Sequence, residues 1–196
     1  MAVEAVVLDV GETLVDETRA WLDVARRADV PAFTLLGVLG GLAERQADHR
    51  QVWGLLGVAG VDSPAIEPRD FYPDALPCLQ RLRAAGLLVG LAGNQPERAA
   101  EDLAGCGIDV DLIATSFGWG VHKPSPEFFA RVSGEIGCAP EKIAYVGDRV
   151  DNDVAPALRA GMVAVHIRRG PWGYLQEPPP GAVGIRSLDE LPAVLS

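Results

Sequence analysis

Cysteine is scarce in this chain, and so is positive charge. The 196 residues include three cysteines, Cys78, Cys106 and Cys138, which lie far apart. Their odd number and wide spacing argue against a disulfide framework or a zinc site, so we expect free thiols in a reducing compartment. Lys and Arg number 17 against 27 Asp and Glu, which gives a formal net charge of -10. An acidic surface of this kind repels phosphate backbones and argues against a nucleic-acid partner.

Long apolar runs are also missing. The stretch LLGVLGGL (35–42) is too short to cross a bilayer. The first residues carry Glu4 and lead directly into an apolar run, which is not the pattern of a secretory leader. These absences predict a cytoplasmic protein with no membrane partner. The sequence does not indicate the oligomeric state.

What the chain does contain is an alternation of apolar and amphipathic segments. Runs rich in β-branched residues predict strands at 4–10, 87–92, 110–115, 142–147 and 163–168. Continuous apolar runs are typical of strands buried on both faces. Helical patterns lie between them, such as the one that Ser125 and Pro126 begin. We therefore predict an α/β fold, a doubly wound parallel sheet with helices on both faces, in which QEPPPGAVG (176–184) is a loop.

Residues 16–70 interrupt this alternation. They indicate two or three helices without a convincing strand. We predict a small α-helical cap here, inserted into a core that consists of residues 1–15 and 71–196. The cap would lie beside the carboxyl ends of the strands, where open α/β sheets place their ligands.

Polar stretches follow four of the predicted strands. They are LDVGET (8–13), LAGNQ (91–95), GVHKPSPEFF (120–129) and VGDRVDND (146–153). Each is weak evidence alone, but their order and spacing are specific. Together with the inserted helices, they resemble the haloacid dehalogenase-like (HAD) hydrolase superfamily, in particular its phosphatase-type members with a small helical cap after the first motif. The resemblance implies a Rossmann-like core and, for most members, Mg²⁺-dependent phosphatase activity.

The resemblance also implies a role for each motif residue. Asp9 corresponds to a nucleophile that forms an aspartyl-phosphate. Lys123 corresponds to a catalytic and substrate-binding lysine that bridges the nucleophile and the phosphoryl oxygens. Mg²⁺ would be bound by Asp9, Asp148 and the backbone carbonyl of Gly11, with Asp153 holding the waters of the same metal site.

Two positions depart from the family's pattern. Gly11 stands where most members have a second acid, two residues after the nucleophile. The missing general acid and base is typically worth about 10²–10⁴-fold in rate, so we expect aryl phosphates to be hydrolysed better than alkyl phosphates. Gly93 stands where the family has Ser or Thr before the Asn. The backbone N–H groups of Gly93 and Asn94, with the Asn94 side chain, remain candidate substrate-binding donors.

Several other polar residues lie near these motifs. Glu12 is a tempting replacement for the missing acid, but we favour a side chain that points to solvent from a turn. Asp151 is expected to be exposed. Arg168, Arg169 and Trp172 follow the last predicted strand, and they indicate either an anion-steering patch or a surface loop with a packed tryptophan.

The expected function is therefore Mg²⁺-dependent hydrolysis of a small phosphorylated metabolite through an aspartyl-phosphate, with activity reduced by the loss of the second acid. One alternative is a weak or inactive HAD-fold binding protein, which the two glycines Gly11 and Gly93 motivate. Another is a haloalkanoic-acid dehalogenase, because those relatives also lack the second acid. The sequence has no G-x-x-x-x-G-K-[ST], which argues against a P-loop NTPase.

Overall fold

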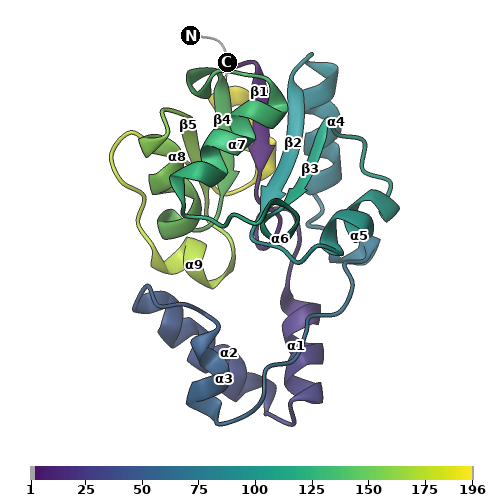
Figure 1. The fold of residues 1–196 in the computed structure, drawn as a ribbon, viewed down its shortest axis with the longest axis vertical. Helices are drawn as coiled ribbons and strands as arrows, with labels where there is room; N and C mark the ends of the chain where they lie inside the picture. The colour runs from purple at the N-terminus through teal and green to yellow at the C-terminus, as the bar shows by residue number, and fades with distance from the viewer. Residues whose placement is uncertain (1–2, 196) are drawn as a thin grey trace.

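The computed structural model describes residues 3–195, and the strands within them form a single sheet. The strands are β1 (Ala5–Leu8), β2 (Leu88–Gly93), β3 (Leu112–Thr115), β4 (Ile143–Gly147), β5 (Val163–Ile167) and β6 (Val183–Ile185). They are parallel and follow the order β3-β2-β1-β4-β5-β6. The predicted doubly wound parallel sheet is confirmed (Figure 1).

Helices connect the strands and also form a separate group below the sheet (Figure 1). They are α1 (Thr18–Arg27), α2 (Ala32–Glu44), α3 (Gln51–Leu56), α4 (Ala75–Ala84), α5 (Ala99–Gly105), α6 (Ser116–Trp119), α7 (Pro126–Ile136), α8 (Ala155–Arg159), α9 (Gly170–Leu175) and α10 (Leu191–Val194). Within residues 3–195, none of them combines the length and the apolar character that crossing a bilayer requires.

The edge strand β6 corrects the sequence prediction. Residues 183 and 184 were assigned to a loop, but Val183 pairs with Val165 of β5, and Ile185 pairs with Ile167. Ile185 is 2% exposed and joins the hydrophobic core, which explains why the segment docks at the sheet edge. Three residues after a proline run are too few to show an apolar period, so the sequence does not reveal the strand.

The alternation of side chains along β1 explains the two helical layers. Successive residues of a strand point to opposite faces of the sheet. Val6 and Leu8 belong to a buried cluster that includes residues of α4, α5 and α10. Ala5 and Val7 belong to a second cluster with α7 and α8 on the other face. Because β1 is covered on both sides, residues at its carboxyl end are held in a rigid, desolvated position.

The helices α1, α2 and α3 have a hydrophobic cluster of their own. It includes Val24 of α1, Leu35 and Leu39 of α2, and Val52 of α3. Trp172 of α9, which follows the fifth strand, also packs into this cluster. The helical group therefore has its own core, and one side chain from the sheet side completes it.

Two segments connect this helical group with the sheet, and they lie side by side. Val15 forms an antiparallel bridge with Phe71, and the backbone N–H of Asp16 donates to the Asp70 carbonyl at 2.8 Å. The Arg19 guanidinium binds both carboxylate oxygens of Asp70, at 2.6 and 2.5 Å. The cap boundaries that we predicted lie at this paired segment, and the division into core and cap stays a prediction.

Candidate active site

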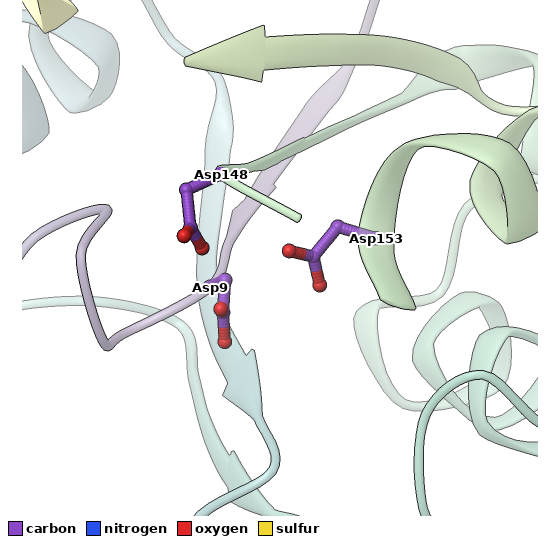
Figure 2. Close-up of side chains that lie close together, drawn as sticks. All are labelled: Asp9, Asp148 and Asp153. Atoms are coloured by element: carbon purple, nitrogen blue, oxygen red, sulfur yellow. The ribbon is translucent and has the colours of Figure 1, made fainter. Parts of the chain in front are cut away.

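Two neighbouring strands deliver carboxylates to the same edge of the sheet. Asp9 follows β1 and Asp148 follows β4. Leu8 is paired with Val146 in register, and the Asp9 N–H donates to the Val146 carbonyl at 2.8 Å. Parallel neighbours end together, so the two side chains emerge beside each other. Figure 2 shows the Asp153 carboxylate, from the short helical segment 150–154 that follows β4, directed toward these two side chains.

Asp9, Asp148 and Asp153 form a compact acidic cluster. Each is buried, and each offers one oxygen that lies within 4.8 Å of the others. Burial, together with the charges of Asp153 and Asp9, raises the pKa of Asp148 well above its ordinary value. Burial also raises the pKa of Asp153 to about 6, although the Lys123 charge opposes this. Carboxylates held this closely favour the binding of a cation between them.

The Lys123 ammonium lies between two of these carboxylates. Its Nζ is 2.8 Å from Asp9 Oδ1 and 2.5 Å from Asp153 Oδ1. Burial would lower the Lys123 pKa, but the charges of Asp153 and Asp9 outweigh it and raise the pKa well above its ordinary value. The side chain therefore remains positively charged. The other Asp153 oxygen accepts a hydrogen bond from the Arg149 N–H at 3.0 Å, which fixes the orientation of this carboxylate.

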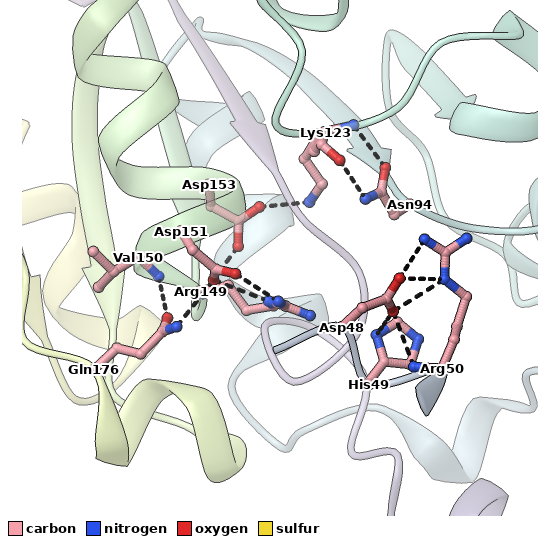
Figure 3. Close-up of polar contacts among 10 residues, drawn as sticks. All are labelled: Asp48, His49, Arg50, Asn94, Lys123, Arg149, Val150, Asp151, Asp153 and Gln176. Carbon is pink, nitrogen blue, oxygen red and sulfur yellow. Dashed lines mark hydrogen bonds and ion pairs between the residues drawn. The ribbon is translucent and has the colours of Figure 1, made fainter. Parts of the chain in front are cut away.

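The Asn94 side chain holds the segment that carries Lys123. Asn94 Nδ2 donates to the Lys123 carbonyl at 3.0 Å, and the Lys123 N–H donates to Asn94 Oδ1 at 2.9 Å (Figure 3). Gly93 is the last residue of β2, and a Cβ at this position would collide with Asp9 Oδ1. The glycine therefore makes room for the Asp9 carboxylate. The substrate-binding roles of Gly93 and Asn94 stay predictions.

The space beside Gly11 is filled by a carboxylate that the sequence analysis did not single out. A Cβ built at position 11 would lie 2.5 Å from Glu17 Oε1 and 2.9 Å from the Glu17 carboxyl carbon. Glu17 immediately precedes α1, at the start of the helical group. Burial, followed by the charge of Glu12, raises the pKa of Glu17 to about 7. An acid is thus present at the position where Gly11 lacks one.

Glu12 does not point to solvent, so that prediction is wrong. The residue is 9% exposed. Its Oε2 accepts a hydrogen bond from the Tyr72 hydroxyl at 2.6 Å, and its Oε1 accepts one from the Glu17 N–H at 3.0 Å. These two donors draw the side chain inward. Because both of its oxygens are engaged by the protein, Glu12 acts as a fixed support for residue 17.

A cavity of about 250 Å³ opens over the acidic cluster. The sheet-edge side of its wall includes Asp9, Gly11, Asn94, Lys123, Asp148 and Arg149. The opposite side includes Glu17, Trp21, His49 and Ser63, and Trp172 of α9 completes the wall. The His49 ring stands edge-on to Trp21 and Trp172, with ring centroids 6.5 and 6.1 Å away. A second cavity of about 620 Å³ shares Glu17, Trp21 and His49 with the first and extends along the helical group.

The predicted anion-steering pair, Arg168 and Arg169, does not line the smaller cavity. Arg169 is held by an ion pair with Asp74 and donates to the Thr13 carbonyl at 2.8 Å. Arg168 lies over the ring of Tyr174. Both guanidiniums have partners away from this cavity, and Trp172 is buried, so the structure favours the second alternative, a loop with a packed tryptophan.

Arg149 supplies a cation to the cavity instead. Its guanidinium stacks over Trp172 at 4.8 Å from the ring centroid. It also forms an ion pair with Asp151 at 2.7 Å (Figure 3). Gln176 also donates to Asp151, at 3.0 Å. Asp151 is therefore half-buried rather than exposed as predicted, because these two side chains cover it.

Besides the predicted residues that follow strands, the site contains four that were not predicted, Glu17, His49, Ser63 and Arg149. Asp9, Lys123, Asp148 and Asp153 converge as their positions after strands predicted. The missed residues lie on helix ends and connecting segments, where no period fixes the direction of a side chain. The sequence signal for Glu17 was an acidic residue six positions after Gly11, the glycine that stands where most family members have an acid.

The comparisons with known proteins agree with this arrangement. The model of the haloacid dehalogenase-like hydrolase family matches residues 3–161. The chain belongs to this family of hydrolases. This HAD hydrolase is 39% identical over 104 residues to the glyceraldehyde 3-phosphate phosphatase of Methanopyrus kandleri. The matched region covers 52% of the chain and 45% of the relative. It is 37% identical over 102 residues to the phosphoserine phosphatase of Thermus thermophilus. This match covers 50% of the chain and 41% of the relative.

The glyceraldehyde 3-phosphate phosphatase of Methanocaldococcus jannaschii is 35% identical over 123 residues, with 61% of the chain and 54% of the relative covered. The chain thus spans about half the length of the curated relatives it matches. Solved structures show the same fold over the whole chain. The HAD phosphatase of Thermococcus onnurineus has a TM-score of 0.68 at 23% identity, with 98% of both chains covered. The putative HAD-hydrolase YfnB of Bacillus subtilis has a TM-score of 0.75 at 16% identity, with 100% of both chains covered.

Proposed function

We propose that this HAD hydrolase is a Mg²⁺-dependent phosphomonoesterase that transfers the phosphoryl group of a small substrate to Asp9 and then to water. The observation that carries the proposal is the buried ammonium of Lys123, held between Asp9 and Asp153 beside Asp148. An attacking carboxylate and a phosphate dianion repel each other. A fixed cation next to the attacking oxygen reduces this repulsion in the ground state and in the transition state.

The acidic cluster fits a hard divalent cation. Its donors are carboxylate oxygens, which Mg²⁺ prefers, and they are buried and close together without enough positive charge from Lys123 to balance all three. Asp9 and Asp148 would hold the ion directly, the Gly11 carbonyl would add a ligand as the family resemblance implies, and Asp153 would hold its waters. When bound, Mg²⁺ neutralises charge on the phosphoryl oxygens and on the groups around them.

The residues of the chain have separate tasks in this reaction. An Asp9 oxygen forms the new bond to phosphorus, and Lys123 fixes that carboxylate while it opposes the charge on the phosphoryl oxygens. Asn94 keeps Lys123 in place through its two backbone hydrogen bonds. The cavity of about 250 Å³ admits a phosphoryl group with a small organic part. The names of the curated relatives also refer to small phosphorylated compounds, which supports this substrate class.

The test is phosphate release from p-nitrophenyl phosphate and from a panel of small phosphomonoesters, with Mg²⁺ or with EDTA. We expect release only with Mg²⁺, and we expect Asp9→Asn to abolish it. Asp109→Asn is the matched control, because this carboxylate is 86% exposed and lies away from the site. A rapid quench should trap a phosphorylated peptide that contains Asp9.

Other outcomes would decide between the alternatives. Equal rates for wild type and Asp9→Asn would contradict the proposal. Failure to release phosphate from any substrate would favour a binding protein. Halide release from a 2-haloalkanoic acid in the presence of EDTA would favour a dehalogenase.

A further inference from the structure

We propose that Glu17 is the general acid and base of this site, in the place of the side chain that Gly11 lacks. The inference rests on the proposed phosphomonoesterase function and names the group that protonates the leaving oxygen. Glu17 and Asp9 line the same cavity of about 250 Å³, together with Lys123. The carboxylate therefore reaches the site from the helical side, whereas the nucleophile reaches it from the sheet.

The position of the Glu17 carboxylate is the central observation. Its Oε1 would lie 2.5 Å from a Cβ at position 11, its carboxyl carbon 2.9 Å and its Oε2 3.5 Å. The whole carboxylate thus occupies the space that any side chain at position 11 would enter. Gly11 and Glu17 are complementary: the glycine is needed for the glutamate to approach, and the glutamate restores the charge that the glycine removes.

Neighbouring groups hold Glu17 in this place. The Glu17 N–H donates to Glu12 Oε1 at 3.0 Å, and Glu12 is in turn anchored by the Tyr72 hydroxyl at 2.6 Å. Trp21 Nε1 donates to Glu17 Oε2 at 3.2 Å, one turn further along α1. The oxygen nearest position 11 is the other one, Oε1. Glu12 and Trp21 are therefore positioning residues, and Glu17 Oε1 is the atom assigned to proton transfer.

Glu12 cannot take this role itself, although it is closer in sequence. Its two carboxylate oxygens accept hydrogen bonds from Tyr72 and from the Glu17 backbone, so a proton transfer through it would break the support of residue 17. Apart from the adjacent residues of the chain, the atoms nearest to a Cβ at position 11 belong to the Glu17 carboxylate.

The proposed reaction has two steps. In the first, an Asp9 oxygen forms a bond to phosphorus, the bond from phosphorus to the leaving oxygen breaks, and the leaving oxygen keeps the electron pair and takes the proton of the Glu17 carboxyl group. In the second, a water oxygen forms a bond to phosphorus while Glu17 takes a proton from that water. The bond between Asp9 and phosphorus breaks, its electron pair returns to the Asp9 carboxylate, and phosphate leaves.

The experiment compares Glu17→Gln with wild type on p-nitrophenyl phosphate and on glycerol phosphate, with Mg²⁺ present. Glycerol phosphate has a poor leaving group that needs the proton, so its turnover should fall about 10²–10⁴-fold. Nitrophenolate leaves without a proton, so its first turnover should survive as a burst. The steady state should then be slow, and phosphorylated Asp9 should accumulate, because water is no longer activated.

Two further variants are measured beside Glu17→Gln. Glu44→Gln makes the same change on the exposed end of α2 and should leave both rates unchanged. The double variant Gly11→Asp with Glu17→Ala moves the carboxylate to position 11 and should recover glycerol phosphate turnover relative to Glu17→Ala alone. A folded double variant that recovers nothing would contradict the inference.

The outcomes separate this inference from the proposed function. If Asp9→Asn abolishes activity while Glu17→Gln hydrolyses glycerol phosphate at the wild-type rate, the phosphomonoesterase stands and the role of Glu17 is wrong. If Glu17→Gln slows both substrates equally and gives no burst, Glu17 is a structural residue only. If Asp9→Asn retains activity, the proposed function itself is wrong.

Discussion

The two sides of the cavity are built in different ways. The sheet edge holds Asp9, Lys123 and Asp153, which are buried, charged and bonded to one another. The facing side holds Trp21 and His49, which are partly exposed aromatic residues of the helical group. The buried charged groups therefore lie where strands end. The aromatic part of the cavity wall comes from helices that pack mainly on one another.

Glu17 belongs to neither pattern alone. It is a charged group at the beginning of the helical segment, yet its carboxylate fills a space on the sheet side. In the proposed reaction, the sheet edge fixes the chemistry of the phosphoryl group, while the helical side supplies the acid and the contacts with the rest of the substrate. Substitutions on the two sides of the cavity should therefore differ in their effects, from the largest at the sheet edge to the smallest in the aromatic wall.

Removing the ammonium from the sheet edge should have the largest effect on stability. Lys123→Met leaves Asp9 and Asp153 buried without their partner, which should lower the free energy of unfolding of the metal-free protein by about 3–5 kcal/mol. Lys142→Met is the control, because the ion pair of Lys142 with Glu4 is exposed and screened by solvent, so its loss should change stability far less. Urea unfolding in EDTA measures both. Equal losses of unfolding free energy in the two variants would mean that the buried ion pairs of Lys123 stabilise the fold no more than the exposed ion pair of Lys142.

Mg²⁺ should stabilise the protein through Asp148. At a concentration 100 times its dissociation constant, a ligand that binds only the folded state adds about 2.7 kcal/mol. Asp148→Asn should abolish this gain. Because the pKa of Asp148 is raised in the folded state, its ionisation destabilises the metal-free protein above the ordinary pKa of an aspartate. The variant should therefore be more stable than wild type at pH 8 in EDTA, and a less stable variant would argue against a strained acidic cluster.

Glu17 should give stability a pH dependence of its own. Its pKa is raised from 4.5 to about 7, so the folded state binds this proton more tightly than the unfolded state. Stability is then unaffected below pH 4.5 and falls as the pH rises toward 7. The full shift corresponds to about 3 kcal/mol, and partial exposure reduces this to about 2 kcal/mol. The difference in unfolding free energy between Glu17→Gln and wild type should grow in favour of the variant between pH 5 and pH 8.

The smallest effect is expected for the indole that orients Glu17. Trp21→Phe keeps an aromatic ring in the wall but removes the hydrogen bond to Glu17 Oε2. Because this hydrogen bond is long, at 3.2 Å, we assign it the value of an ordinary one, about 1 kcal/mol, so kcat on an alkyl phosphate should fall about five-fold with little change in KM. Trp53→Phe is the control, since Trp53 lines the larger cavity but not the smaller one. A change in KM alone would assign Trp21 to substrate binding.

The sequence was sufficient to predict the parts of the molecule that depend on parallel strands. Five of the six strands within residues 3–195 are continuous apolar runs, and Asp9 and Asp148 converge because they follow two strands that pair in register. β6 was missed because three residues carry no period. Its position depends on packing of Ile185 against the rest of the core, which only the assembled fold provides.

The position of Glu17 could not be derived from its surroundings in the sequence. It results from a turn in which Glu12 adopts a left-handed conformation, with φ of 50°, and receives the N–H of residue 17. Non-glycine residues seldom adopt this conformation, so the local sequence favours an ordinary turn instead. The return of the chain over Gly11 is a tertiary effect, and glycine permits it by having no side chain.

Trp172 has a consequence for how substrate and product exchange. The indole is 6% exposed, packs with the helical group although it belongs to α9, and stacks on Arg149 at the cavity. Separation of α1, α2 and α3 from the sheet would withdraw them from this ring, at a cost on the order of 2 kcal/mol, because a buried aromatic side chain covers roughly 150–250 Å² of surface. In the proposed reaction, a release of phosphate through separation of these helices from the sheet would require this indole to be uncovered first.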